Sequence, residues 1–294
     1  MAVVNQFEYA KPKLLDEALE ILSKSDNLYL LAGGTDLVDM IKEGIIQPDV
    51  VLDVKGIDQL HKITFENNTL FIGATVTFTE LIESGTIEKY FPVIAEMSKT
   101  VASMGIRNRA TMAGNICSAV PCMDSGPLLT SYEAEIIAVS KKGKRRVPAE
   151  KWFINSRKTA IEKGEIVKGI SIPYPGKHGG CFVKLGRYEG EDLAQVNLLI
   201  LALEDGTFRI SYGSVGPTPI RAKKIEEVLN GNAINSLLIE EAVRQVENEI
   251  KPITDVRATK EYRMHMAKIM LERGLSAAVS RLNGNGPEYG KSVI

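Results

Sequence analysis

Two short segments of this sequence carry the residues best suited to holding an anion. Residues 30–36 form an apolar run that leads into Gly33 and Gly34, and residues 111–116 place Gly114 shortly after a threonine hydroxyl. A strand that ends in glycine and enters a helix exposes several backbone N–H groups, and a residue without Cβ lets the backbone approach an anion closely. Together, the two segments predict a dinucleotide whose pyrophosphate is held by two loops.

Neither segment contains a standard nucleotide-binding motif. Both lack the GxGxxG fingerprint of Rossmann domains and the GxxxxGK sequence of P-loop proteins. Taken alone, a strand followed by Gly-Gly and a helix can be a tight turn without any ligand. Thr35 and Thr111 add hydroxyl donors, and either Thr35 or Asp36 is suited to cap the helix that follows the first segment.

Apolar periodicity predicts the elements that position these segments. Short strands are expected at residues 29–32, 49–54, 69–74, 134–140, 165–172 and 181–185. Helices are expected at residues 13–23, 37–44 and about 125–132, and over most of residues 78–104 with breaks near Gly85 and Pro92. The first segment therefore lies between a strand and a helix, and a helix follows the second.

The composition changes near residues 173–180, which are rich in proline and glycine and form the best candidate for a linker. Beyond it, long strands are expected at residues 194–204 and 207–215, joined by a turn at Asp205 and Gly206. Apolar residues at helical spacing predict helices in the rest of the chain. Strands followed by helices indicate an α+β layer pair in the second half.

The composition excludes several classes of protein. The 294 residues are 44% hydrophobic and 25% charged, and 36 basic residues nearly balance 37 acidic ones, so nothing favours nucleic acid or an anionic membrane as a partner. The first residues do not resemble a signal peptide, and no apolar run is long enough for a membrane helix. Three cysteines cannot form an even disulfide framework. We therefore expect a cytoplasmic protein.

Several further segments extend the pattern over residues 30–221. With the two glycine segments, they resemble the FAD-binding subunit of molybdenum hydroxylases, of the xanthine dehydrogenase type. The matching positions are Ile106-Arg107-Asn108, Thr111, Gly114-Asn115-Ile116, Pro121, Asp124, Glu165-Ile166-Val167, Ile172-Pro173, Phe182 to Arg187, Asp192-Leu193-Ala194 and Gly216 to Arg221. Any one of them is unspecific, but their order over most of the chain is specific.

The resemblance implies an α+β fold. Residues 1–176 would form an FAD-binding domain of the vanillyl-alcohol-oxidase or PCMH type with two α/β subdomains, and residues 177–294 a smaller α+β domain with an antiparallel sheet and helices. It also implies the cofactor-binding residues. The pyrophosphate would be wrapped by Tyr29, Leu30, Leu31, Ala32, Gly33, Gly34, Thr35 and Asp36 and by Thr111, Met112, Ala113, Gly114 and Asn115.

Four residues outside these segments complete the site that the resemblance implies. Asp124 would reach the ribityl chain or adjacent groups, and Val167 would contribute backbone contacts. Lys184 would lie near the polar edge of the flavin, where a positive charge stabilises the anionic reduced form. Leu193 would lie over the isoalloxazine ring.

The implied function is electron transfer with noncovalent FAD. The chain would accept electrons from [2Fe–2S] clusters in a small partner subunit and pass them to NAD⁺ or another acceptor. A large partner subunit with the molybdenum cofactor would hydroxylate the organic substrate. The chain itself would need no catalytic residue and no metal. Some relatives carry an inserted four-cysteine cluster site, and this chain lacks the cysteines for it.

The sequence departs from the family pattern at Ala113, where relatives commonly have glycine, and at Cys122 and Met123 before Asp124. Two other functions stay open: a self-contained FAD-dependent oxidase or dehydrogenase of the same fold, and a non-catalytic assembly subunit. No histidine falls in a glycine segment, which disfavours a histidyl-linked flavin.

Three further features have a plain and a functional interpretation. The basic run at residues 141–146 is a solvated hairpin tip or a docking patch. The acidic segment at residues 188–192 gates the flavin or is a solvated turn. We expect Cys117 and Cys122 to be buried, inert thiols, although backbone N–H groups could lower the pKa of Cys117 and make it reactive.

Overall fold

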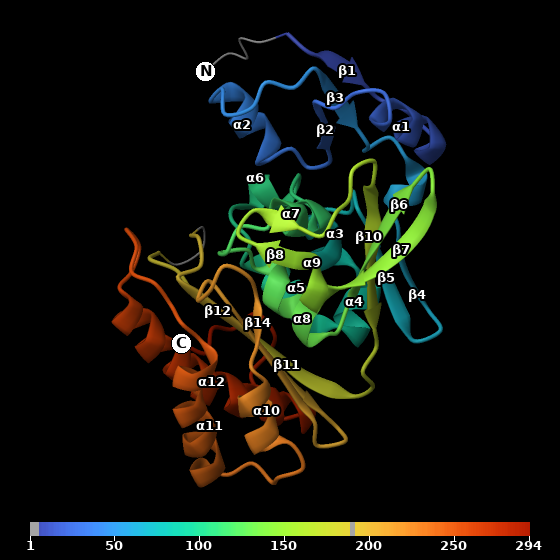
Figure 1. Cartoon of the computed structure of the whole chain (residues 1–294). Coiled ribbons are helices and arrows are strands. Elements are labelled where there is room, and N and C mark those ends of the chain that lie inside the picture. Colours follow the sequence, from blue (N-terminus) through green and yellow to red (C-terminus); the bar gives the residue numbers. More distant parts are fainter. Residues whose placement is uncertain (1–5, 189–191) are drawn as a thin grey trace.

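A small parallel sheet forms the N-terminal subdomain, which lies at the top of Figure 1. The computed structural model describes residues 6–188 and 192–294. The strand order is β1-β3-β2, and two helices join the strands. The elements are β1 (Glu8–Ala10), α1 (Leu15–Leu22), β2 (Leu28–Leu31), α2 (Leu37–Lys42) and β3 (Val50–Asp53). Buried residues of α1 and β3 share a core with Val139 and Ile166 of the next subdomain, so the two subdomains pack together.

The second subdomain is built on a five-stranded antiparallel sheet with the order β4-β5-β10-β6-β7. Its strands are β4 (Ile63–Glu66), β5 (Thr69–Gly73), β6 (Glu135–Ser140), β7 (Gly143–Pro148) and β10 (Ile166–Pro173). Short helices lie against it: α3 (Phe78–Glu83), α4 (Gly85–Tyr90), α5 (Pro92–Lys99), α6 (Met104–Arg107), α7 (Met112–Ser118), α8 (Ser125–Ser131) and α9 (Ala149–Trp152). The turn η1 (Asp58–Leu60) and the hairpin β8 (Phe153–Asn155) and β9 (Lys158–Thr159) complete it.

The C-terminal domain has a four-stranded antiparallel sheet with the order β11-β12-β13-β14. Its elements are β11 (His178–Leu185), β12 (Val196–Leu203), β13 (Phe208–Gly213), β14 (Ile220–Arg221), α10 (Lys223–Leu229), α11 (Ser236–Glu249) and α12 (Lys260–Leu282). In Figure 1, α10, α11 and α12 lie together at the lower left, on the outer side of the sheet.

Strand β12 joins the two domains through its two faces. All eight of its residues are buried. Leu199 and Leu201 pack in the core of the second subdomain, whereas Leu198 and Ile200 pack in the core under α12. Because side chains alternate across a strand, one strand serves both cores, and the apolar run at residues 198–203 is the sequence pattern expected for a strand buried on both faces.

A buried ion pair fastens the end of the chain to the second subdomain. Arg281, near the end of α12, donates to both carboxylate oxygens of Glu96 in α5, at 2.8 and 3.0 Å. The guanidinium also donates to the carbonyl of Gly180 at 2.7 Å. Glu96 accepts two further bonds, from the N–H groups of Phe182 and Gly290, each at 2.9 Å. The charged side chains are only 4% and 3% exposed, so each depends on the other for its stability in the interior.

The predicted α+β arrangement is what the structure shows, and the expected strands and helices agree with it to within a few residues. Two expectations were wrong in detail. The second glycine segment lies in helix α7 and not in a loop. The linker is shorter than residues 173–180, because β11 already begins at His178. We retain the domain boundary between residues 176 and 177 as a proposal. None of the helices in the described residues is long and apolar enough to cross a membrane.

Candidate cofactor-binding site

The first glycine segment packs directly on the chain that leads into the second. A Cβ at Gly33 would lie 2.2 Å from the carbonyl oxygen of Arg109 and 2.9 Å from Cα of Ala110. Gly34 has a φ of +79°, a conformation that side chains with Cβ rarely adopt. The two glycines therefore have different reasons to be glycine: Gly33 allows the close approach of two backbones, and Gly34 allows the turn into α2.

The second segment begins a helix. The hydroxyl of Thr111 accepts a hydrogen bond from the N–H of Gly114 at 2.9 Å and so caps α7. The N–H of Phe78 donates to the carbonyl of Ala110 at 3.0 Å and fixes the chain just before the cap. Since Ala113 has helical geometry, it needs no positive φ, and the replacement of the glycine common in relatives leaves this backbone unstrained.

The first segment presents a set of free backbone donors. In residues 6–188 and 192–294, the N–H groups of Gly33, Gly34, Thr35 and Asp36 donate to no protein acceptor. Buried backbone N–H groups without a partner are rare in native proteins, and Gly33 is buried. Gly33 itself lies against the chain at Arg109 and Ala110, shortly before α7 begins. The residues present therefore fit an anionic group such as the pyrophosphate of a dinucleotide.

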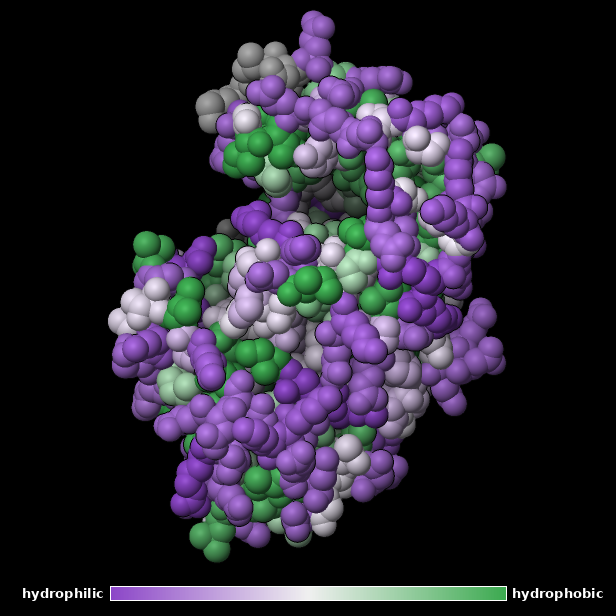
Figure 2. Space-filling model, in the orientation of Figure 1, coloured by the Kyte–Doolittle hydropathy of each residue, from purple (hydrophilic) through white to green (hydrophobic). Residues whose placement is uncertain are grey.

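Of the two residues suited to cap α2, Thr35 and Asp36, the structure places Asp36 at the N-cap position. Its side chain makes no capping bond, and its backbone already has helical φ and ψ angles. Its carboxylate instead accepts a hydrogen bond from the hydroxyl of Ser118, at the end of α7. This bond connects the N-terminal subdomain to the second subdomain, and Figure 2 shows a hollow between them on this face. The tertiary partner therefore decides the role of Asp36.

Asp124 and Lys184 form a buried ion pair next to the second segment. The Nζ of Lys184 lies 2.6 Å from one carboxylate oxygen of Asp124, and the two side chains are 9% and 7% exposed. The other carboxylate oxygen accepts from Nδ2 of Asn197 at 2.9 Å. Burial raises the pKa of Asp124 above its usual range, and the nearby Lys184 partly opposes that rise. The side-chain oxygen of Asn115 accepts from the N–H of Ser125 at 3.3 Å, which ties the pair to α7.

The remaining expected residues lie in different settings. The side chain of Val167 is buried in the same core as Ala113, at a point where the register of β10 with β6 shifts, so only its backbone is available to a ligand. Tyr29, Leu30 and Leu31 belong to β2, and their backbone is engaged in pairing with β3. Leu193 is 48% exposed. Part of the acidic segment, residues 189–191, lies outside the described residues.

Cys117 and the basic run at residues 141–146 each had a plain and a functional interpretation. The residue Cys117 is exposed, not buried as expected. Desolvation of its thiol nevertheless raises the pKa to about 12, so the thiol is not activated. In the basic run, Lys141, Arg145 and Arg146 pair with carboxylates, which weakens its interpretation as a docking patch. The described residues contain no group of three or more His, Cys, Asp or Glu that could hold a metal.

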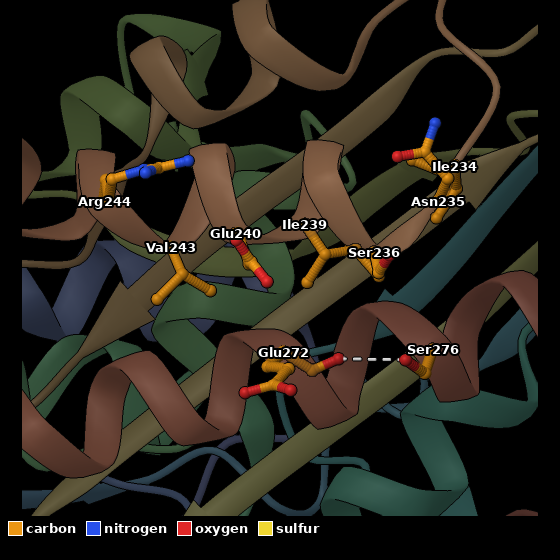
Figure 3. A pocket seen from close by; sticks show the side chains of 9 residues that line it. All are labelled: Ile234, Asn235, Ser236, Ile239, Glu240, Val243, Arg244, Glu272 and Ser276. Carbon is orange, nitrogen blue, oxygen red and sulfur yellow. Dashed lines mark hydrogen bonds between the residues drawn. The ribbon is translucent and has the colours of Figure 1, made fainter.

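One cavity of the described structure lies away from the glycine segments. It has a volume of about 690 Å³ and lies between α11 and α12, where Ile239 and Val243 form its apolar wall and Glu240, Arg244 and Glu272 its charged rim (Figure 3). It is lined by none of the residues expected to bind the cofactor. The glycine segments, and not this cavity, therefore define the candidate site.

The fold and the site define a flavoprotein of the class with a two-part FAD-binding domain and a smaller α+β domain. Residues 5–175 match the family described as the FAD binding domain in molybdopterin dehydrogenase, and residues 182–278 match the CO dehydrogenase flavoprotein C-terminal domain. The chain belongs to this family, the FAD-binding medium subunits of molybdenum hydroxylases, and it is an oxidoreductase subunit.

Known proteins resemble the chain over nearly its full length. The glyceraldehyde dehydrogenase medium chain of Sulfolobus acidocaldarius is 30% identical, over 90% of this chain and 95% of that protein. The xanthine dehydrogenase FAD-binding subunit of Escherichia coli O157:H7 is 29% identical, over 94% and 97%. A chain of carbon monoxide dehydrogenase from Hydrogenophaga pseudoflava superposes with a TM-score of 0.90 at 32% identity, covering 96% of this chain and 99% of that one.

Proposed function

We propose that this chain is the FAD-carrying electron-transfer subunit of a xanthine dehydrogenase-like molybdenum hydroxylase, in a complex that we expect in the cytoplasm. It receives electrons from [2Fe–2S] clusters of a small partner subunit and passes them to NAD⁺ or another acceptor. The molybdenum cofactor belongs to a large partner subunit. The observation that carries the proposal is the set of four free N–H groups at residues 33–36, held against the chain at Arg109.

These donors would hold the pyrophosphate of FAD. A hydrogen bond to a charged oxygen contributes about 1.5–3 kcal/mol, so three or four of them hold the cofactor firmly. Thr111 and Asn115 would complete this part of the site. Lys184 and Asp124 would lie toward the flavin, and Leu193 would cover it. When bound, FAD supplies the capacity to take up and release electrons one or two at a time.

Noncovalent binding is supported by the surroundings of the histidines. Nε2 of His61 lies 2.8 Å from a carboxylate oxygen of Glu80. His178 is in contact with the hydroxyl of Tyr132 at 2.8 Å and the carbonyl of Gly176 at 2.8 Å. Two of the three histidine rings therefore have a structural partner, and none of the three, His265 included, belongs to a glycine segment.

Two carboxylates of the described residues, Glu165 and Asp124, are engaged with cations and not arranged as an acid and base pair. Glu165 accepts from Arg145 at 2.7 Å, and this contact holds the pKa of Glu165 below its usual range. Asp124 is engaged with Lys184 and Asn197. Two carboxylates that each have their own cation do not form the acid and base pair of a hydrolase or a self-contained oxidase. This supports a subunit that transfers electrons and leaves the organic substrate to its partner.

The test begins with the absorption spectrum of the purified chain before and after acid precipitation. We expect flavin bands and release of FAD into the supernatant. NADH or another donor should then reduce the bound FAD, and no small organic substrate should do so without the partner subunits. Colour that stays in the precipitate, or turnover of an organic donor by the chain alone, would favour the oxidase. A colourless chain that takes up no added FAD would favour an assembly subunit.

A further inference from the structure

The ammonium group of Lys184 is buried and donates hydrogen bonds to two acceptors. Its Nζ donates to the carboxylate of Asp124 at 2.6 Å and to the carbonyl of Thr100 at 2.8 Å. Residue 100 follows α5, Asp124 precedes α8, and Lys184 is in β11. The ammonium group is therefore held between three elements, with a carboxylate in direct contact.

Asn197 fixes the orientation of that carboxylate. Its Nδ2 donates to Asp124 at 2.9 Å and to the carbonyl of Met123 at 3.0 Å. Its Oδ1 is buried and has no partner in the described part of the chain. An unpaired buried acceptor lowers stability. The hydrogen bonds that the amide group donates therefore explain why the side chain is held in this position. Those donors act on the turn that carries Asp124.

We infer that Asp124 sets the reduction potential of the bound FAD, by offsetting the charge that Lys184 presents to the flavin and with Asn197 as its positioning residue. The inference rests on the proposed function. A lone ammonium group near the flavin favours the reduced, negatively charged cofactor. A carboxylate 2.6 Å from the same ammonium offsets much of the positive charge that a bound ligand experiences. The pair therefore keeps the potential lower than Lys184 alone would.

The test is the midpoint potential of FAD in the full-length chain. Asp124→Asn keeps the shape of the side chain and removes its charge. It should bind reduced FAD about tenfold more tightly relative to oxidised FAD, which raises the midpoint by about 30 mV for a two-electron couple. Lys184→Met should shift the midpoint in the opposite direction. The double variant should return toward the wild-type value, because the net charge is again zero.

Glu226→Gln is the matched control. Glu226 forms a similarly buried ion pair with Arg221, at 9% and 10% exposure, but in the C-terminal domain at α10. It should leave the potential unchanged. If Asp124→Asn does not fold, Asp124→Ser removes the same charge, and the midpoint potential of that variant is interpreted in the same way.

The outcomes separate this inference from the proposed function. A raised potential in the Asp124 variant and its reversal in the double variant support the inference. An unchanged potential in a variant that is fully loaded with FAD overturns it and leaves the proposed function intact. A wild-type chain that takes up no FAD overturns both.

Discussion

Replacement of Gly33 by alanine tests the central contact of the site. The added Cβ would lie 2.2 Å from the carbonyl oxygen of Arg109, whereas carbon and oxygen atoms in close contact are separated by about 3.3 Å. The two backbones must therefore move apart by about 1 Å. The atom in the way belongs to the backbone, so rotation of a side chain does not relieve the clash.

This displacement has two consequences of different size. Overpacking of this kind lowers the free energy of unfolding by about 1–3 kcal/mol. A hydrogen bond of 2.9 Å that opens by 1 Å is no longer a hydrogen bond. If two bonds to the pyrophosphate are lost, at about 1.5–3 kcal/mol each, the Kd for FAD rises by about 10²–10⁴-fold.

The assay is a titration of the FAD-free protein with FAD, followed by flavin fluorescence, together with urea unfolding of the same samples. Gly85→Ala is the control, because a Cβ there meets no atom within 4 Å and its φ is not positive. A folded Gly33→Ala protein that retains stoichiometric FAD with wild-type affinity would refute the assignment of the pyrophosphate to this segment.

Three further predictions follow from other contacts. Gly114→Ala should raise the Kd for FAD by less than about tenfold, because the new Cβ lies 3.0 Å from the Thr111 hydroxyl and the position is helical, where alanine is favoured by about 1 kcal/mol. The same titration measures the Kd, and a loss of affinity as large as that of Gly33→Ala would contradict the geometry. Glu96→Gln should lower the free energy of unfolding by about 3–5 kcal/mol, since it leaves Arg281 charged and without its carboxylate in the interior. Urea unfolding measures this loss, and adding Arg281→Met to the Glu96→Gln protein should lower the free energy of unfolding by less than the same change does in the wild type. Burial lowers the pKa of His178 below its ordinary 6.5, so the unfolded chain binds a proton there at a higher pH than the folded chain. The contribution of neutral His178 to stability is therefore complete above about pH 6.5 and is lost as the pH falls toward the folded pKa. His178→Phe should flatten the fall in unfolding free energy between pH 7 and the acid range, and an unchanged slope would show that another group is responsible.

Much of the fold could be predicted from local patterns. Apolar spacing located most helices and strands, because a helix or a half-buried strand repeats its environment every few residues. The strands β1 and β4 were missed, since three or four residues are too few to establish a period. The glycine pair at residues 33 and 34 could also be recognised, because positive φ and close approach leave few alternatives to glycine.

The roles of individual side chains depended on residues far away in the sequence. Asp36 was one of two residues suited to cap a helix, but its partner is Ser118, 82 residues later. Lys184 was expected as a positive charge near the flavin, but Asp124, 60 residues earlier, lies in contact with it. Cys117 was expected to be buried, and only the packing of the subdomains shows that it is accessible.

The sequence by itself therefore determined the elements, the α+β class and the two segments with glycine, because these depend on the conformational limits of neighbouring residues. The tertiary structure alone decided which backbone faces Gly33, which charge faces Lys184 and where the end of α12 is fastened. The physical reason is that burial and electrostatic interactions act through space. The ionic partner of a side chain is selected by the packing of the second subdomain and the C-terminal domain on the two faces of β12, and no pattern of nearby residues encodes it.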